Sequence, residues 1–130
     1  MKTTTIWKKK EEFKSFQGQN EIELDGNREN GFSPKALLLS SLAACSGIDV
    51  VEILAKMRVK FSDFEIDVET EQTNDHPKVF KDIMIIYRVK SDSVNEEKIK
   101  KAIDLSLDKY CGVSAMLKKN SAIHYKLQLL

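Results

Sequence analysis

Two cysteines are the residues of this sequence best suited to redox chemistry. Cys45 lies in a long uncharged segment, and its neighbours over 43–47 are all small, so another backbone or a substrate can approach the sulfur. Cys111 precedes Gly112 at the expected start of a short helix, where unpaired N–H groups and the helix dipole stabilise a thiolate and lower its pKa. The alternative interpretation of each cysteine is an inert buried residue, because free cysteine is among the most buried residue types.

Metal, hydrolytic and phosphate chemistry find little support in the sequence. His76 lies in a predicted turn and His124 in a predicted strand, and neither has metal-ligand spacing from a cysteine. No Gly-x-Ser-x-Gly element indicates a serine nucleophile, and no glycine-rich loop indicates a phosphate site. We therefore expect no metal site.

Length and charge restrict the class of protein. The 130 residues are typical of one domain, which we place over 1–130. The formal net charge is +1, and the basic run 8–10 is followed at once by Glu11 and Glu12, so we expect no nucleic-acid partner. No apolar segment is long enough to predict a membrane span, and the N-terminal residues lack a signal-peptide core. We expect a cytoplasmic protein, in which a static disulfide is rare.

The element that carries Cys45 is predicted to be a long helix. Ser33 has the character of an N-cap and Pro34 that of a first helical residue, and the helix is expected to continue to Met57. From Ala36 to Ile48 no side chain is charged. A helix that is apolar on all sides must be surrounded by protein, and a small domain has difficulty covering it alone. We therefore expect a second subunit to cover part of it.

The remaining elements predict an α+β fold. Alternating polarity and turn residues indicate strands, and the period of the apolar residues indicates a helix starting at Asn95, with an apolar stripe that ends at Tyr110, and a short helix from Val113. The predicted strands are Thr3–Lys10, Phe13–Gln17, Glu21–Asp25, Phe64–Glu69, Val79–Lys90 and Ile123–Leu129. The strands on either side of the 74–77 turn are expected to form an antiparallel hairpin.

Several segments resemble the OsmC/Ohr family, and in particular its OsmC-like branch. The matching motifs are Ser33-Pro34, Leu37-Leu38-Leu39, Ala43-Ala44-Cys45, Ile48-Asp49-Val50-Val51, His76-Pro77-Lys78-Val79-Phe80, Ala102-Ile103-Asp104-Leu105-Ser106, Lys109-Tyr110-Cys111-Gly112-Val113 and Ala115-Met116-Leu117. Their order and spacing agree over roughly residues 20–130. The resemblance implies an intertwined homodimer, in which two central buried helices are wrapped by antiparallel β-sheets.

The resemblance also implies an activity, the thiol-dependent reduction of organic hydroperoxides and hydrogen peroxide in stress defence. Cys45 would be the peroxidatic nucleophile, which becomes a sulfenic acid. Cys111 would be the resolving thiol, which condenses with that acid to a disulfide, and a dithiol reductant would reopen it. This chemistry requires neither a metal nor an organic cofactor.

Two positions bear on whether the chemistry is retained. Peroxidatic members carry a glutamate just after the proline, where this chain has Lys35 and Ala36, and an arginine on an N-terminal loop, for which Arg28 is the candidate. Lys35 could supply positive charge near the sulfur or be a solvated residue of the first turn. The alternative to a Cys-based peroxidase is a dimer that binds an apolar small molecule at its interface. The third hypothesis is a purely structural dimer with unreactive thiols.

Overall fold

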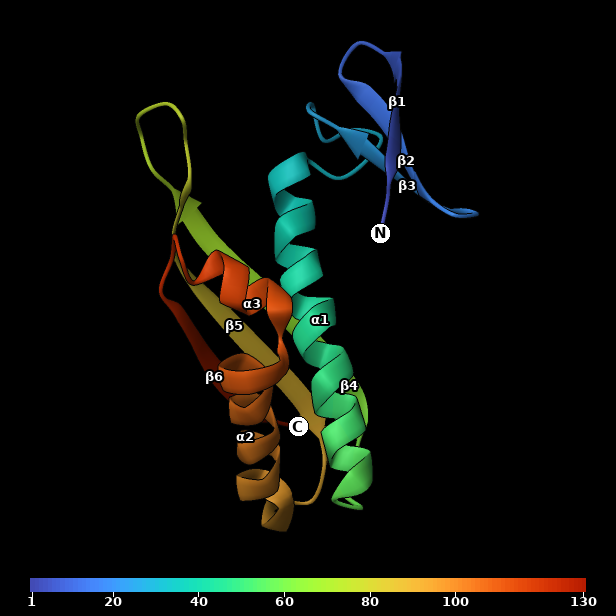
Figure 1. Cartoon of the computed structure of the whole chain (residues 1–130). Coiled ribbons are helices and arrows are strands. Elements are labelled where there is room, and N and C mark those ends of the chain that lie inside the picture. Colours follow the sequence, from blue (N-terminus) through green and yellow to red (C-terminus); the bar gives the residue numbers. More distant parts are fainter. The chain divides into compact units, whose positions relative to one another are not determined.

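The computed structural model describes all residues, Met1–Leu130, and the chain forms two compact units, Met1–Leu39 and Ser40–Leu130. Figure 1 labels their elements. The N-terminal unit is a three-stranded antiparallel sheet in the order β1-β2-β3, which confirms the three strands predicted there. Its strands are β1 (Thr4–Lys9), β2 (Glu12–Gln17) and β3 (Asn20–Asp25).

Helix α1 (Pro34–Lys56) is the long helix predicted from the uncharged segment. The Ser33 hydroxyl oxygen accepts a hydrogen bond from the Ala36 N–H at 3.4 Å, as an N-cap does. The inward stripe has one residue per turn: Leu42, Ser46, Val50 and Leu54. The opposite side keeps Ile48 60% and Val51 42% exposed. One chain therefore leaves an apolar face of this helix uncovered, as the composition had indicated.

Contrary to the expectation from the uncharged segment alone, the full helix α1 is long and apolar enough to cross a membrane by length and composition. The core helix of a soluble protein passes the same test, so that property does not decide the environment of the helix.

The C-terminal unit is built on a second three-stranded sheet, in the order β4-β5-β6. Strands β4 (Ser62–Gln72) and β5 (Phe80–Lys90) form the predicted antiparallel hairpin. Strand β6 (Ile123–Leu129) pairs with β5 in parallel, so the expectation of wholly antiparallel sheets is wrong for this pair. The reason is the long connection through two helices, which returns the chain to the end of the sheet where β5 began.

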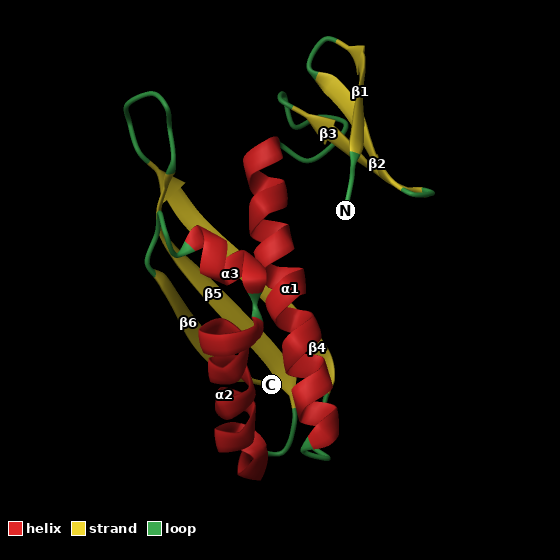
Figure 2. Cartoon of the chain, in the orientation of Figure 1, coloured by secondary structure: helices red, strands yellow, loops and turns green.

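Helices α2 (Glu96–Leu105) and α3 (Gly112–Leu117) lie over one face of this sheet (Figure 2). Every second residue of β5 points into the resulting core: Ile83, Ile85, Tyr87 and Val89. Ile99, Ala102 and Ile103 of α2 are buried as predicted, but Tyr110 is 54% exposed. A π-helical turn over Ser106–Tyr110 changes the helical period, and so takes Tyr110 out of the apolar stripe.

The start of α2 also differs from the predicted one. Asn95 makes no side-chain capping bond and belongs to a 3₁₀ turn, Ser93–Asn95, that precedes the helix. Asp92 caps that turn, since its carboxylate accepts a hydrogen bond from the Val94 N–H at 3.0 Å.

Candidate functional site

Cys45 is half-buried on α1, directly before the inward-facing Ser46. The helix therefore holds the sulfur at the border of the stripe that packs on the sheet, not within that stripe. Gly47 leaves little space between α1 and β4, because a Cβ built on it would lie 3.0 Å from the Ile66 side chain of β4. Gly47 thus allows α1 to pack closely on β4, whereas the predicted approach of a backbone or substrate to the Cys45 sulfur stays a prediction.

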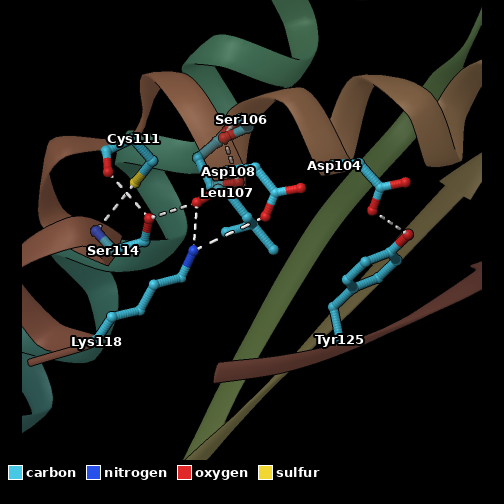
Figure 3. A network of polar contacts seen from close by, with 9 residues as sticks. Asp104, Ser106, Leu107, Asp108, Cys111, Ser114, Lys118 and Tyr125 are labelled. Atoms are coloured by element: carbon cyan, nitrogen blue, oxygen red, sulfur yellow. Dashed lines mark hydrogen bonds and ion pairs between the residues drawn. The ribbon is translucent and has the colours of Figure 1, made fainter. Parts of the chain in front are cut away.

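Cys111 joins the π-helical turn to α3 and is buried, with 3% of its surface exposed. Its sulfur accepts a hydrogen bond from the Ser114 N–H at 3.3 Å, and its own N–H donates to the Ser106 carbonyl at 2.7 Å. The Ser114 hydroxyl donates back to the Cys111 carbonyl at 2.9 Å. Figure 3 shows the two contacts between Cys111 and Ser114. The backbone on both sides of Cys111 is therefore fixed by local hydrogen bonds.

The segment that carries Cys111 is also tied to the far end of α3. The Lys118 ammonium donates to the Leu107 carbonyl at 2.5 Å and lies 4.0 Å from the Asp108 carboxylate (Figure 3). The Leu107 carbonyl lies near the end of a helical segment, where carbonyls lack backbone N–H partners, and Lys118 supplies it with a hydrogen-bond donor. Lys118 consequently helps to hold the turn that positions Cys111.

Burial raises the pKa of the Cys111 thiol, and the hydrogen bond from Ser114 offsets only part of this effect. Electrostatic interaction with Cys45 raises the pKa of Cys111 further. The prediction that a helix N-terminus lowers the pKa of Cys111 is therefore wrong, because desolvation outweighs one N–H donor. The two thiols therefore interact electrostatically, although they are distant in the sequence.

A chain of buried polar groups runs beside the cysteine pair. The Ser46 and Tyr87 hydroxyl oxygens are 2.6 Å apart, and the Ser106 hydroxyl lies 2.9 Å from both the Ser46 hydroxyl and the Asp49 carboxylate. Ser46, Ser106 and Tyr87 are fully buried, and Asp49 is half-buried. No buried side-chain nitrogen or oxygen in the chain lacks a hydrogen-bond partner. The sequence did not predict this hydrogen-bond network, because serines spaced far apart in the sequence form no motif.

Burial raises the pKa of Tyr87 to about 12, although the hydrogen bond with Ser46 acts in the opposite direction. The charges of Cys111 and Asp49 contribute to the increase, so both groups lie within electrostatic range of the phenol. Tyr87 therefore stays a neutral hydroxyl at physiological pH. It can donate one hydrogen bond without adding negative charge beside the thiols.

An apolar hollow of about 630 Å³ lies between α1 and β4 in this unit. Its lining includes the small residues of α1 and two carboxylates at the rim: Ser40, Ala43, Ala44, Gly47, Ile48, Val51, Glu52, Phe64, Glu65 and Ile66. Neither cysteine forms part of this lining. The hollow is thus a feature of the exposed face of α1 and is separate from the thiol pair.

Arg28 belongs to the N-terminal unit, outside the unit that holds both cysteines. It is exposed in the loop after β3 and has a φ of 60°, in the left-handed region. The buried Asp25 carboxylate shapes this loop by accepting hydrogen bonds from the N–H groups of Asn27, Glu29 and Asn30. Lys35 is exposed in the first turn of α1.

No three histidine, cysteine, aspartate or glutamate side chains gather as metal ligands would. His124 is exposed on β6, with its ring nitrogen 3.8 Å from the Asp82 carboxylate, and His76 is exposed before Pro77. Neither histidine contributes to the cysteine site. The groups that the structure places at that site are the two thiols, the hydroxyls of Ser46, Tyr87 and Ser106, and the Asp49 carboxylate.

Comparison with known proteins agrees with this arrangement. The family model described as OsmC-like protein matches residues 13–126. This chain belongs to the OsmC-like family. Protein YhfA of Escherichia coli strain K12 is 32% identical over 112 residues, covering 85% of this chain and 84% of YhfA. The two chains are therefore similar over most of their length.

Solved structures of the family have the same fold. An OsmC-like protein from Mycoplasma pneumoniae has a TM-score of 0.87 at 20% identity, over 99% of this chain and 96% of that one. The organic hydroperoxide resistance protein OhrB of Bacillus subtilis has a TM-score of 0.66 at 18% identity, over 98% and 96% of the two chains. At these identities the likeness establishes the α+β fold of OsmC-like proteins and nothing finer.

Proposed function

We propose that this protein reduces organic hydroperoxides through Cys45 and Cys111. The proposal is supported by the electrostatic interaction between the half-buried Cys45 thiol and the buried Cys111 thiol. Cys45 is the more accessible of the two, and Cys111 has a pKa raised by burial and by Cys45. The accessible thiol is suited to meet the substrate, and the buried protonated thiol is suited to act second.

The reaction proceeds in three balanced steps. The Cys45 thiolate attacks the outer oxygen of the hydroperoxide, the O–O bond breaks, and the leaving alkoxide takes a proton to become an alcohol. Cys45 is then a sulfenic acid, oxidised by two electrons. Cys111 attacks its sulfur, a disulfide forms and water leaves. A dithiol reductant reopens that disulfide by exchange and is itself oxidised to a disulfide.

Arg28 is proposed to assist as the cation that the family resemblance assigns to an N-terminal loop. Arg28 has a positive φ, so the residue that replaces it must also tolerate positive φ if the loop is to keep its conformation. Arg28→Asn meets this condition and removes the charge. We expect it to slow the first oxidation step, with no change in the disulfide once formed. An unchanged rate of that step removes Arg28 from the site.

The test is the intact mass of the denatured protein before and after one equivalent of cumene hydroperoxide. Formation of the disulfide lowers the mass by about 2 Da per chain and blocks both thiols to alkylation. Cys45→Ser is expected to abolish peroxide consumption. Cys111→Ser is expected to permit one turnover and leave a sulfenic acid that a dimedone probe captures. Full activity in Cys45→Ser would exclude the mechanism.

We also propose that the working form is a cytoplasmic homodimer. The exposed apolar side of α1 supports this, since Ile48 and Val51 would otherwise remain in water. Ile48→Asp is expected to shift the chain to a monomer in analytical ultracentrifugation. Val94→Asp is the matched control, because Val94 is 79% exposed and lies on the 3₁₀ turn before α2, outside α1. Equal sedimentation of wild type and Ile48→Asp would contradict this interface.

A second candidate function is the binding of an apolar small molecule. The hollow between α1 and β4 supports it, because its lining is mainly apolar and its volume falls in the range of ligand sites. The absence of a glutamate after Pro34 favours this candidate over catalysis. A reduced protein whose mass and free thiols are unchanged by cumene hydroperoxide would decide for binding. The reverse result decides for the peroxidase.

A further inference from the structure

Ser106 is hydrogen-bonded to both segments that carry a cysteine. Its hydroxyl lies 2.9 Å from the Ser46 hydroxyl and 3.4 Å from the Ser46 carbonyl, and Ser46 directly follows Cys45. Its carbonyl accepts the Cys111 N–H at 2.7 Å. One fully buried residue therefore connects α1 at Cys45 with the turn that ends at Cys111.

The number of hydroxyl protons fixes which group donates in each hydrogen bond of the network that contains Ser106. An ionised carboxylate only accepts, so the single O–H of Ser106 donates to Asp49 at 2.9 Å. The Ser46 hydroxyl must then donate to Ser106, and the Tyr87 hydroxyl to Ser46. All three hydroxyls donate toward Asp49, and each has a partner only while the next one is present.

A fully satisfied buried network of this kind admits one arrangement of the segments that it joins. Moving α1 against the Ser106–Tyr110 turn would leave buried hydroxyls without partners, which costs about 1–3 kcal/mol for each group. Apolar packing alone tolerates small shifts more readily. The network is thus placed where a small shift would change the separation of the two sulfurs.

We propose that Ser106 and Asp49 are positioning residues for the Cys45–Cys111 pair. Together they hold α1 and the π-helical turn in one register, and so raise the effective concentration of one thiol at the other. None of the atoms in these hydrogen bonds changes when the thiols become a disulfide. This inference rests on the proposed function only in taking the two cysteines as a redox pair.

The test is the reduction potential of the Cys45–Cys111 disulfide, measured in dithiol/disulfide buffers by alkylation and mass. No peroxide is used. Ser106→Ala removes the connecting hydroxyl, and we expect about a tenfold lower effective concentration, which makes the potential about 30 mV less negative. Asp49→Ala is expected to shift it in the same direction by less. Asp49→Asn keeps an acceptor oxygen and should remain near the wild-type value.

Ser121→Ala is the matched control, because Ser121 is also buried and donates its hydroxyl to the Phe80 carbonyl at 3.3 Å. A merely structural serine would lower the free energy of unfolding without moving the potential. A folded Ser106→Ala protein with the wild-type potential would overturn the inference. If that variant does not fold, Asp49→Ala decides in the same way.

The reduction potential tests the positioning role, and the experiment with cumene hydroperoxide tests the proposed function, so the two hypotheses can fail independently. A shifted potential in a protein that does not react with cumene hydroperoxide supports the positioning role and removes the proposed function. A wild-type chain that forms no Cys45–Cys111 disulfide in any buffer overturns the positioning role. Capture of a Cys45 sulfenic acid in that chain would still support the first step of the proposed reaction.

Discussion

The phenol of Tyr87 gives the most quantitative prediction about stability. In the folded chain its pKa is raised to about 12, mainly by burial, whereas an unfolded chain titrates near 10. Between these values the unfolded state has lost the proton and the folded state keeps it, so stability decreases as the pH rises. A difference of about 2 pKa units corresponds to about 3 kcal/mol. That stability is fully present below pH ~10 and is lost by pH ~12.

Tyr87→Phe removes the titrating group from the buried network. At neutral pH the change should cost only about 0.5–1.5 kcal/mol, since Ser46 loses a donor but keeps Ser106 as the acceptor for its own hydroxyl. The assay is urea unfolding of wild type and Tyr87→Phe at matched protein concentration, from pH 8 to pH 12. The difference between the two proteins isolates Tyr87 from Tyr125, whose pKa is also raised to about 12.

The expected result is that the stability advantage of the wild type disappears and reverses as the pH rises from about 10 to 12. A difference in unfolding free energy between the two proteins that stays constant over this range would contradict the raised pKa of Tyr87. It would mean that the phenol is solvated in the folded protein, or that it does not donate into the network.

Three further outcomes follow from the same contacts. Ser106→Ala should lower the free energy of unfolding in urea at pH 7 by about 2–3 kcal/mol, and Tyr87→Phe by about 1 kcal/mol. The larger cost is expected because Ser106→Ala leaves the Ser46 hydroxyl without an acceptor. Equal costs would contradict the assigned direction of the hydrogen bonds. In native reduced protein, timed alkylation with mass analysis should label Cys45 before Cys111, because Cys111 is buried and its pKa is raised; the reverse order would contradict the assigned roles. Leu42→Ala should cost about 2–5 kcal/mol at an unchanged m-value, because Leu42 is fully buried; a cost below 1 kcal/mol would mean that α1 does not pack as described.

The sequence predicted most of the elements, for reasons that the structure confirms. Alternation along β5 placed Ile83, Ile85 and Val89 inward, and the N-cap at Ser33 placed the start of α1. These features are local and depend on side chains that are near in sequence. The fold class followed from the order of the elements, and the family from motifs in register.

The features that local patterns do not record were missed or predicted wrongly. The parallel pairing of β6 depends on where a long connection returns the chain. The π-helical turn shifted Tyr110 by changing the helical period. The pKa of Cys111 was predicted in the wrong direction, because the sequence shows one helix N-terminus but not the burial of the thiol or its contact with Cys45.

The site itself was only partly accessible to sequence reasoning. Cys45 and Cys111 were named as a pair through the resemblance, and their role as a redox pair stays a prediction, supported by the electrostatic interaction of the two thiols. Ser106 and Asp49 carried no signal of their own, because their importance lies in contacts between α1 and the Ser106–Tyr110 turn. Arg28 remains a prediction based on the family.

The most direct test of the central claim is the mass experiment with cumene hydroperoxide on reduced wild-type protein. We expect a loss of about 2 Da per chain, with both Cys45 and Cys111 blocked to alkylation and restored by a dithiol. An unchanged mass with both thiols free would contradict the peroxidase and leave an OsmC-like scaffold whose hollow, not its cysteines, performs the function.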